Sequence, residues 1–220
     1  MGIDHPLRIG LSTRISKAEG YDELRDSLAQ DWILFMRENL PGIEWQMLPN
    51  EGASIVERIR TWGINGLILT GGNNIGEYPQ KDETDNALFS FALTHDLPVL
   101  GVCRGLQVMA NFFGVPLDKC TDGSHRAQRH PVQVLKSPGE TIERFEVNSY
   151  HTFVIRGETM KDPLETWALG DDGTVEALAV KGKPAFALMW HPERERTIDA
   201  FTEGILGKLF KGDSTWYNKG

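Results

Sequence analysis

Cysteine is scarce in this sequence: only Cys103 and Cys120 occur among 220 residues, too few for a disulfide framework. No apolar segment approaches the roughly 18 residues that a membrane-spanning helix needs. No N-terminal segment combines basic residues with a long apolar run, so no secretory signal peptide is expected. The formal net charge of −8 argues against nucleic-acid binding through a general basic field. These absences predict a cytoplasmic protein that binds neither membranes nor nucleic acids.

The composition is that of an ordinary globular domain. Hydrophobic residues make up 40% of the chain and charged residues 25%, and the length is ample for a buried core. We expect a single domain over residues 1–211, followed by a loosely attached tail over residues 212–220. The sequence leaves the oligomeric state open, including a homodimer.

The first half of the sequence alternates between apolar strands and amphipathic helices. The predicted strands are 7–11, 43–48, 66–70 and 97–102, and the predicted helices are 22–40, 54–62, 82–95 and 106–113. This alternation predicts an α/β fold, with an open, mostly parallel sheet and helices on both faces. After Gly114, short strand-like segments predict an antiparallel extension packed beside that sheet: 132–135, 145–147, 165–169, 175–180 and 185–189. A hairpin turn is expected at 171–173 and a closing helix along 198–210.

Cys103 lies where a predicted strand meets a predicted helix, in the segment 101–107, which reads GVCRGLQ. Glycine on both sides permits a tight turn that projects the cysteine beyond the edge of the sheet. The N-terminus of the following helix would favour the thiolate. Cys103 is therefore a candidate nucleophile, although this pattern alone also fits a buried structural cysteine.

His191 and Glu193 follow a second apolar strand, in the segment 190–193, which reads WHPE. A cysteine nucleophile needs a base to take its proton and an acid to orient that base. Two residues apart at a strand end, the two side chains can project to the same side. We predict that His191 is the general base and then the general acid, oriented by Glu193. Glu195 is the alternative orienting group. The non-catalytic interpretations are a structural histidine for His191 and a solvated surface carboxylate for Glu193.

Several histidines raise the question of a metal site, namely His125, His130, His151 and His191. The spacing of His125 and His130 matches no strong zinc signature, and Cys120 is poorly placed to complete one. The spacing therefore predicts no metal site.

Four ordered motifs resemble the class I glutamine amidotransferase superfamily, within it most closely the γ-glutamyl hydrolase branch. They are the cysteine elbow, the segment 70–73 (TGGN), the segment 148–151 (NSYH) and the segment 190–193. The resemblance extends from about residue 8 to residue 210 and implies a flavodoxin-like fold without a cofactor. It implies a triad of Cys103, His191 and Glu193, with an oxyanion hole formed by the backbone amides of Gly72 and Arg104.

The resemblance also suggests residues that hold a small-molecule γ-glutamyl substrate: Asn73, Gln107, Ser149, Tyr150 and His151. The alternatives from the residues themselves are a solvent-facing helix residue for Gln107 and plain turns for Asn73 and for 148–151. The implied activity is hydrolysis of a γ-glutamyl amide through a γ-glutamyl thioester on cysteine, with release of L-glutamate.

Three segments, 70–74, 148–153 and 189–194, resemble γ-glutamyl-CDP-amidate hydrolases more than γ-glutamyl-γ-aminobutyrate hydrolases. The γ-glutamyl-CDP-amidate hydrolases split CDP-L-glutamine during synthesis of the phosphoramidate of bacterial capsules. A diphosphate leaving group would attract cations, and the candidates are Arg14, Lys17, Arg104, His125, Arg126 and Arg129. The basic run 124–130 could equally be an ordinary solvated loop.

Three other functions stay open. They are a γ-glutamyl-γ-aminobutyrate hydrolase, a glutaminase subunit that passes ammonia to a partner synthetase, and a non-catalytic binding module. The module is disfavoured because binding alone would not require Cys103, His191 and Glu193 together.

Overall fold

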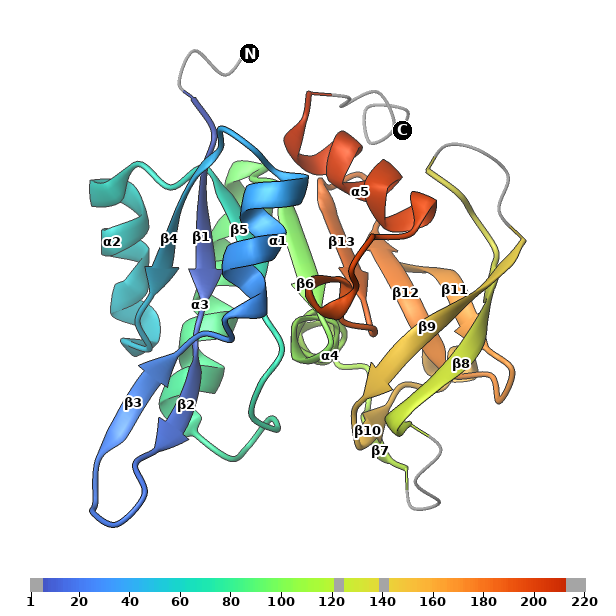
Figure 1. The fold of residues 1–220 in the computed structure, drawn as a ribbon, viewed down its shortest axis with the longest axis horizontal. Helices are drawn as coiled ribbons and strands as arrows, with labels where there is room; N and C mark the ends of the chain where they lie inside the picture. The colour runs from blue at the N-terminus through green and yellow to red at the C-terminus, as the bar shows by residue number, and fades with distance from the viewer. Residues whose placement is uncertain (1–5, 121–124, 139–142, 213–220) are drawn as a thin grey trace.

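The computed structural model describes residues 6–120, 125–138 and 143–212, and these residues form one nine-stranded central sheet (Figure 1). In spatial order, its strands are β4 (Glu44–Leu48), β1 (Arg8–Ser12), β5 (Gly66–Leu69), β6 (Val99–Val102), β13 (Ala185–Leu188), β12 (Val175–Val180), β11 (Leu164–Gly170), β8 (Arg126–Val134) and β9 (Arg144–Tyr150). The first five run parallel, and the rest pair antiparallel. The predicted α/β class with a mostly parallel, flavodoxin-like sheet is confirmed.

Helices cover both faces of the parallel strands. The helices α1 (Asp31–Asn39) and α5 (Ala200–Phe210) pack on one face, in front of the sheet in Figure 1. The helices α2 (Ile55–Trp62), α3 (Pro79–His95) and α4 (Arg104–Phe112) pack on the other. Every residue of β5, β6 and β13 is buried, which explains why these strands are continuously apolar rather than alternating.

The predicted helix over 22–40 is wrong in its first half. Residues 14–27 instead contain the hairpin of β2 (Arg14–Lys17) and β3 (Leu24–Ser27), and α1 begins only at Asp31. Leu24 is exposed, so its helical spacing from the later apolar residues was coincidental. Asp26 also accepts hydrogen bonds from the backbone and side-chain nitrogens of Asn50. These contacts anchor β3 to the segment after β4.

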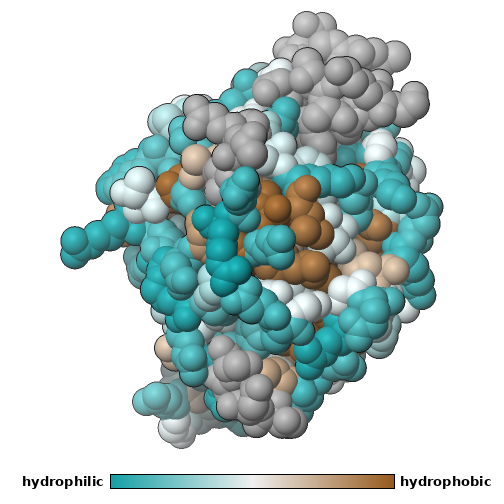
Figure 2. All heavy atoms as spheres, turned by 90° about the vertical axis from the view of Figure 1, so that its right-hand side faces the viewer, coloured by the Kyte–Doolittle hydropathy of each residue, from teal (hydrophilic) through white to brown (hydrophobic). Residues whose placement is uncertain are grey.

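The predicted antiparallel extension is present and continues the parallel half within one sheet, because β12 pairs directly with β13. The predicted turn at 171–173 closes the β11–β12 hairpin, with the Gly170 amide donating to the Thr174 carbonyl at 2.8 Å. Figure 2 views this side of the molecule and shows apolar side chains at the surface among mostly polar ones.

None of the helices in the described part of the chain combines the length and apolar content that crossing a membrane requires. The predicted tail lies outside the described residues from residue 213 onward, and the single-domain boundary stays a prediction.

Candidate active site

Three neighbouring parallel strands end at the same edge of the sheet and deliver the candidate residues there. The strand β5 leads into the glycine loop 70–73, β6 leads into Cys103, and β13 leads toward His191. Ligands of open α/β sheets bind beyond such carboxyl ends. Here Gly71, Gly72, Cys103, His191 and Glu193 line a cavity of about 500 Å³.

Cys103 occupies a sharp elbow between β6 and α4. Its backbone has φ 51° and ψ −98°, a region that residues with a side chain rarely adopt and that marks stored strain. Gly105 makes the elbow sterically feasible, because a Cβ there would lie 2.2 Å from the Leu69 carbonyl oxygen. The predicted turn thus places a cysteine at the N-terminus of α4, where free amides and the helix dipole favour a thiolate.

The imidazole of His191 is oriented by Glu193. Its Nδ1 lies 2.7 Å from Oε1 of Glu193, and both side chains are buried. This contact directs the Nδ1 proton to the carboxylate and leaves Nε2 for proton exchange. Glu195, the alternative in the sequence, instead accepts a hydrogen bond from Asn148 at 2.8 Å and pairs with Arg129.

The pKa of His191 is set by opposing effects. Burial lowers it, but the charge of the Cys103 thiolate, a hydrogen bond to that sulfur and the Glu193 carboxylate outweigh burial and raise the pKa from 6.5 to about 9. A histidine with this raised pKa is protonated at neutral pH. A protonated imidazole next to a cysteine can favour the thiolate form of a nucleophile and can supply a proton to a leaving group.

We expect kcat/KM for a γ-glutamyl substrate to fall as pH rises through about 9, because neutral His191 cannot protonate the leaving nitrogen. In Glu193→Gln the alkaline limb should move to lower pH, because removing the carboxylate removes one of the interactions that raise the pKa. The measurement is the pH profile of kcat/KM for both enzymes with one substrate, whose own titration is common to both. Superimposable alkaline limbs would contradict this assignment.

Asn148 holds the backbone of His191 in place, a role the sequence did not reveal. Its Oδ1 accepts from the His191 amide at 2.9 Å, and its Nδ2 donates to the His191 carbonyl at 2.8 Å. Asn148 lies on β9, which is four strands from β13 in the sheet. Sequence patterns therefore flagged the segment 148–151 but could not show that Asn148 reaches across to His191.

The glycine loop is fixed on two sides. Thr70 donates two hydrogen bonds to Ser12, from its hydroxyl to the carbonyl at 2.7 Å and from its amide to Oγ at 3.0 Å. The Asn73 side chain accepts from the Ile15 amide and donates to the Ile15 carbonyl. The side-chain amide of Asn73 thus attaches the loop to β2. The loop also lies close to His191, because a Cβ on Gly71 would lie 2.6 Å from Cε1 of His191 and would displace the imidazole.

The structure separates the predicted substrate-binding residues into two groups. Asn73 and Tyr150 line the cavity. Gln107, Ser149 and His151 are buried outside its lining and bond within the protein, to the carbonyls of Phe153, His125 and Phe153 respectively.

Only Arg14 among the predicted leaving-group cations lines this cavity. The others lie elsewhere: Lys17 pairs with Asp22, the Arg104 guanidinium is buried against Asp82 and Asp85, Arg126 is exposed on β8, Arg129 pairs with Glu195, and His125 is buried beside His130 and His151. Arg194, which the sequence did not single out, also lines the cavity, and its guanidinium lies 4.3 Å from the centre of the Tyr150 ring.

A second group of titratable side chains lies outside the cavity lining, with all but His130 buried. His125, His130 and His151 gather around Glu176, which the sequence had not connected with them. Burial, and then the charge of His125, lower the pKa of His151 to about 3. Burial likewise raises the pKa of Glu176 well above its usual value.

Comparison with known proteins identifies relatives that match most of this sequence. The family model for glutamine amidotransferase class-I matches residues 37–200. The chain is 30% identical over 199 residues to a γ-glutamyl-CDP-amidate hydrolase of Campylobacter jejuni, covering 87% of this chain and 92% of that protein. It is also 30% identical over 163 residues to one subunit of the glutamine-hydrolysing GMP synthase of Thermoplasma volcanium, covering 71% and 74% of the two chains.

Solved structures show the same architecture. A crystal structure from Thermoplasma acidophilum, assigned to a GMP synthase, matches with a TM-score of 0.69 over 94% of both chains at 23% identity. That identity by itself shows a common fold alone. The family model, however, spans most of this sequence, and the Campylobacter relative aligns along nearly its full length. The chain therefore belongs to the class-I glutamine amidotransferase family.

Proposed function

We propose that this protein is a cysteine hydrolase that cleaves the γ-glutamyl amide bond of CDP-L-glutamine and releases L-glutamate. The observation that carries the proposal is one cavity that holds Cys103, the His191–Glu193 pair and two arginines, Arg14 and Arg194. The similarity to the Campylobacter hydrolase supports the same substrate. A nucleotide substrate and a thiol nucleophile both suit the cytoplasm, where precursors of a capsule phosphoramidate would be made.

The first half of the proposed reaction breaks the amide bond. The Cys103 thiolate attacks the γ-carbonyl carbon, and the carbonyl oxygen takes up the negative charge. The tetrahedral intermediate collapses, the C–N bond breaks, and the His191 imidazolium gives its proton to the leaving nitrogen. The products are cytidine diphosphoramidate and a γ-glutamyl thioester on Cys103.

The second half hydrolyses the thioester. Neutral His191 takes a proton from water, which attacks the thioester carbonyl, and the C–S bond breaks to give L-glutamate. The thiolate and imidazolium are thereby restored. Glu193 stabilises the imidazolium in both halves through its 2.7 Å contact with Nδ1. No cofactor takes part in this scheme.

The oxyanion hole is assigned to the backbone amides of Gly72 and Arg104. Arg104 is the first residue of α4, and amides in a first helical turn have no helical acceptor. Gly72 lines the cavity from the opposite loop. Losing one such donor typically raises the barrier by about 3 kcal/mol.

The leaving group is inferred from the charge around the cavity. Arg14 is an exposed residue at the start of β2, lines the cavity and has no ion-pair partner among the described residues. Arg194 lies against Tyr150 at the same cavity. Guanidinium groups bind phosphate oxygens in bidentate fashion, whereas ammonia released from glutamine would need no cation. The cavity therefore favours a substrate with an anionic leaving group.

Substrate competition tests this assignment. The measurement is kcat/KM for CDP-L-glutamine, γ-glutamyl-γ-aminobutyrate and L-glutamine, with the nucleotide expected to be preferred. In Arg14→Ala we expect kcat/KM for the nucleotide to fall about 10- to 100-fold through loss of a charged contact, with L-glutamine nearly unaffected. Lys17→Ala is the matched control, because Lys17 lies on the same strand but pairs with Asp22 outside the cavity lining. Equal or better turnover of the aminobutyrate amide would exclude the nucleotide assignment.

The similarity to the GMP synthase of Thermoplasma volcanium favours one alternative, a glutaminase that supplies ammonia to a synthetase partner. That function predicts L-glutamine as the preferred substrate and a synthetase that co-purifies with the native protein. The proposed hydrolase should instead turn over CDP-L-glutamine as the isolated chain.

A further inference from the structure

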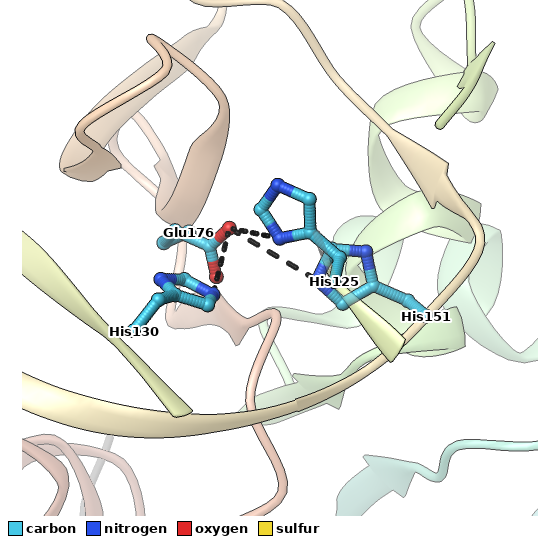
Figure 3. A group of neighbouring side chains, drawn as sticks. All are labelled: His125, His130, His151 and Glu176. Carbon is cyan, nitrogen blue, oxygen red and sulfur yellow. Dashed lines mark ion pairs between the residues drawn. The ribbon is translucent and has the colours of Figure 1, made fainter. Parts of the chain in front are cut away.

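Four side chains from separate parts of the antiparallel half point toward one another, three of them buried and His130 half-buried (Figure 3). His125 immediately precedes β8, His130 lies on β8, His151 follows β9, and Glu176 lies on β12. Each contributes one potential ligand atom, and these atoms all lie within 4.8 Å of one another. The group, here called the histidine cluster, contributes no residue to the lining of the active-site cavity.

The outward-facing nitrogen of each histidine already has a hydrogen-bond acceptor. These nitrogens contact oxygen acceptors: His125 Nε2 lies 3.0 Å from Oδ2 of Asp172, His130 Nδ1 lies 3.2 Å from the Pro131 carbonyl, and His151 Nδ1 lies 3.0 Å from the Phe153 carbonyl. A carbonyl or carboxylate oxygen can only accept, so each of these nitrogens carries the proton. The other nitrogen of each ring consequently presents a lone pair to the interior. Such outer contacts are typical of histidines that bind a metal.

Within residues 6–120, 125–138 and 143–212, the inward-facing atoms have no hydrogen-bond partner. They are Nδ1 of His125, Nε2 of His130, Nε2 of His151 and Oε2 of Glu176. The three nitrogens lie 3.8 to 4.0 Å from Oε1 of Glu176, too far for direct hydrogen bonds. With Glu176 ionised, as a bound cation requires, one water could donate to only two of the four acceptors. A cation at the centre would contact the lone pairs of all four atoms and would keep Glu176 ionised.

We propose that the histidine cluster binds one Zn²⁺ ion. Three imidazoles and one carboxylate make a four-ligand set of the kind zinc prefers. Ligand atoms about 2.1 Å from a tetrahedral ion lie roughly 3.4 Å apart. Because the four atoms lie within 4.8 Å of one another, each side chain need move inward by less than about 1 Å. Because the protein supplies all four ligands, the site is closed and structural, not catalytic.

The position of the ion defines its effect. It would cross-link the start of β8, the end of β9 and the buried strand β12. Tyr150, which lines the active-site cavity, directly precedes the ligand His151, and Asn148, which holds His191, is also on β9. Zinc would thus stabilise the part of the fold that supports one wall of the active site, whichever substrate that site takes.

Metal analysis of the full-length protein tests the proposal. Untagged protein from zinc-supplemented cells should contain about one zinc per chain, measured by plasma mass spectrometry. Removal of the ion with a strong chelator should lower Tm by about 5 °C or more, and Zn²⁺ should restore it. Zinc at background level, together with no increase in Tm on adding Zn²⁺, would overturn the proposal, and stoichiometric iron or manganese would overturn the assignment to zinc.

Variants locate the ion within the molecule. Glu176→Gln and His130→Ala should each lose most of the bound zinc. His95→Ala replaces an exposed histidine on α3 and should retain it, and so should Cys103→Ala, which excludes binding at the active-site thiol. Wild-type zinc content in Glu176→Gln and His130→Ala would place the ion elsewhere. If those variants fail to fold, X-ray absorption of the wild-type zinc protein decides, since a sulfur ligand would contradict the site.

Discussion

Replacing Cys103 with alanine is expected to lower kcat for the γ-glutamyl substrate by about 10⁴-fold or more, with little change in Tm. No other cysteine lines the cavity, so no other described residue there can form the thioester. Alanine fits the elbow at least as well as cysteine, because the close approach to Leu69 is made by Gly105, not by residue 103. The measurements are kcat under saturating substrate and a thermal unfolding curve.

Cys120→Ala is the matched control for that variant. Cys120 is outside the cavity lining, and its backbone amide bonds the Thr152 carbonyl, an interaction that alanine preserves. We expect activity near that of the parent enzyme. If Cys103→Ala retained more than about one-hundredth of the parent kcat, a thioester on this residue could not be on the main reaction path.

Glu193→Gln should reduce kcat about 10³- to 10⁴-fold. Glutamine is nearly isosteric, so the cavity keeps its shape, but its neutral side chain cannot stabilise the imidazolium of His191. The Glu193 carboxylate is buried and lies 2.7 Å from Nδ1, where solvent cannot replace it. Steady-state kinetics with the preferred substrate measure the loss.

Glu195→Gln provides the comparison, because Glu195 contacts Asn148 and Arg129 and not the imidazole. We expect less than a tenfold reduction, since an amide oxygen can still accept from Asn148. Similar losses in the two variants would mean that the carboxylate at 193 has no special role in orienting His191.

The sheet could be predicted where burial on both faces leaves a continuous apolar run, as in β5, β6 and β13. The β2–β3 hairpin could not. Its residues are mostly exposed, and it is held by tertiary contacts such as the bonds from Asn50 to Asp26. Local periodicity carries no information about such contacts.

The candidate site could also be predicted from the sequence only in part. The two-residue spacing of His191 and Glu193 predicted their contact. The order of the predicted strands placed Cys103 at the same edge of the sheet. The cations could not be placed, because proximity in sequence does not determine which side chains face a cavity. Arg126 and Arg129 are in the basic run but lie outside the cavity lining, whereas Arg194 directly follows Glu193 and is part of it.

The histidine cluster shows the limit of spacing arguments most clearly. The sequence predicted no metal because His125 and His130 match no zinc signature. The fourth side chain, Glu176, comes from β12, and the cluster forms only when β8, β9 and β12 come together.

A γ-glutamyl thioester on Cys103 is the intermediate on which the proposed function depends, and it can be observed directly. The wild-type enzyme would be mixed with CDP-L-glutamine, quenched in acid during turnover, digested and analysed by mass spectrometry. We predict the added mass of one γ-glutamyl group on the peptide that contains Cys103, absent after turnover is complete. A γ-glutamyl group on the Cys120 peptide, or none on any cysteine while glutamate is being released, would contradict the mechanism.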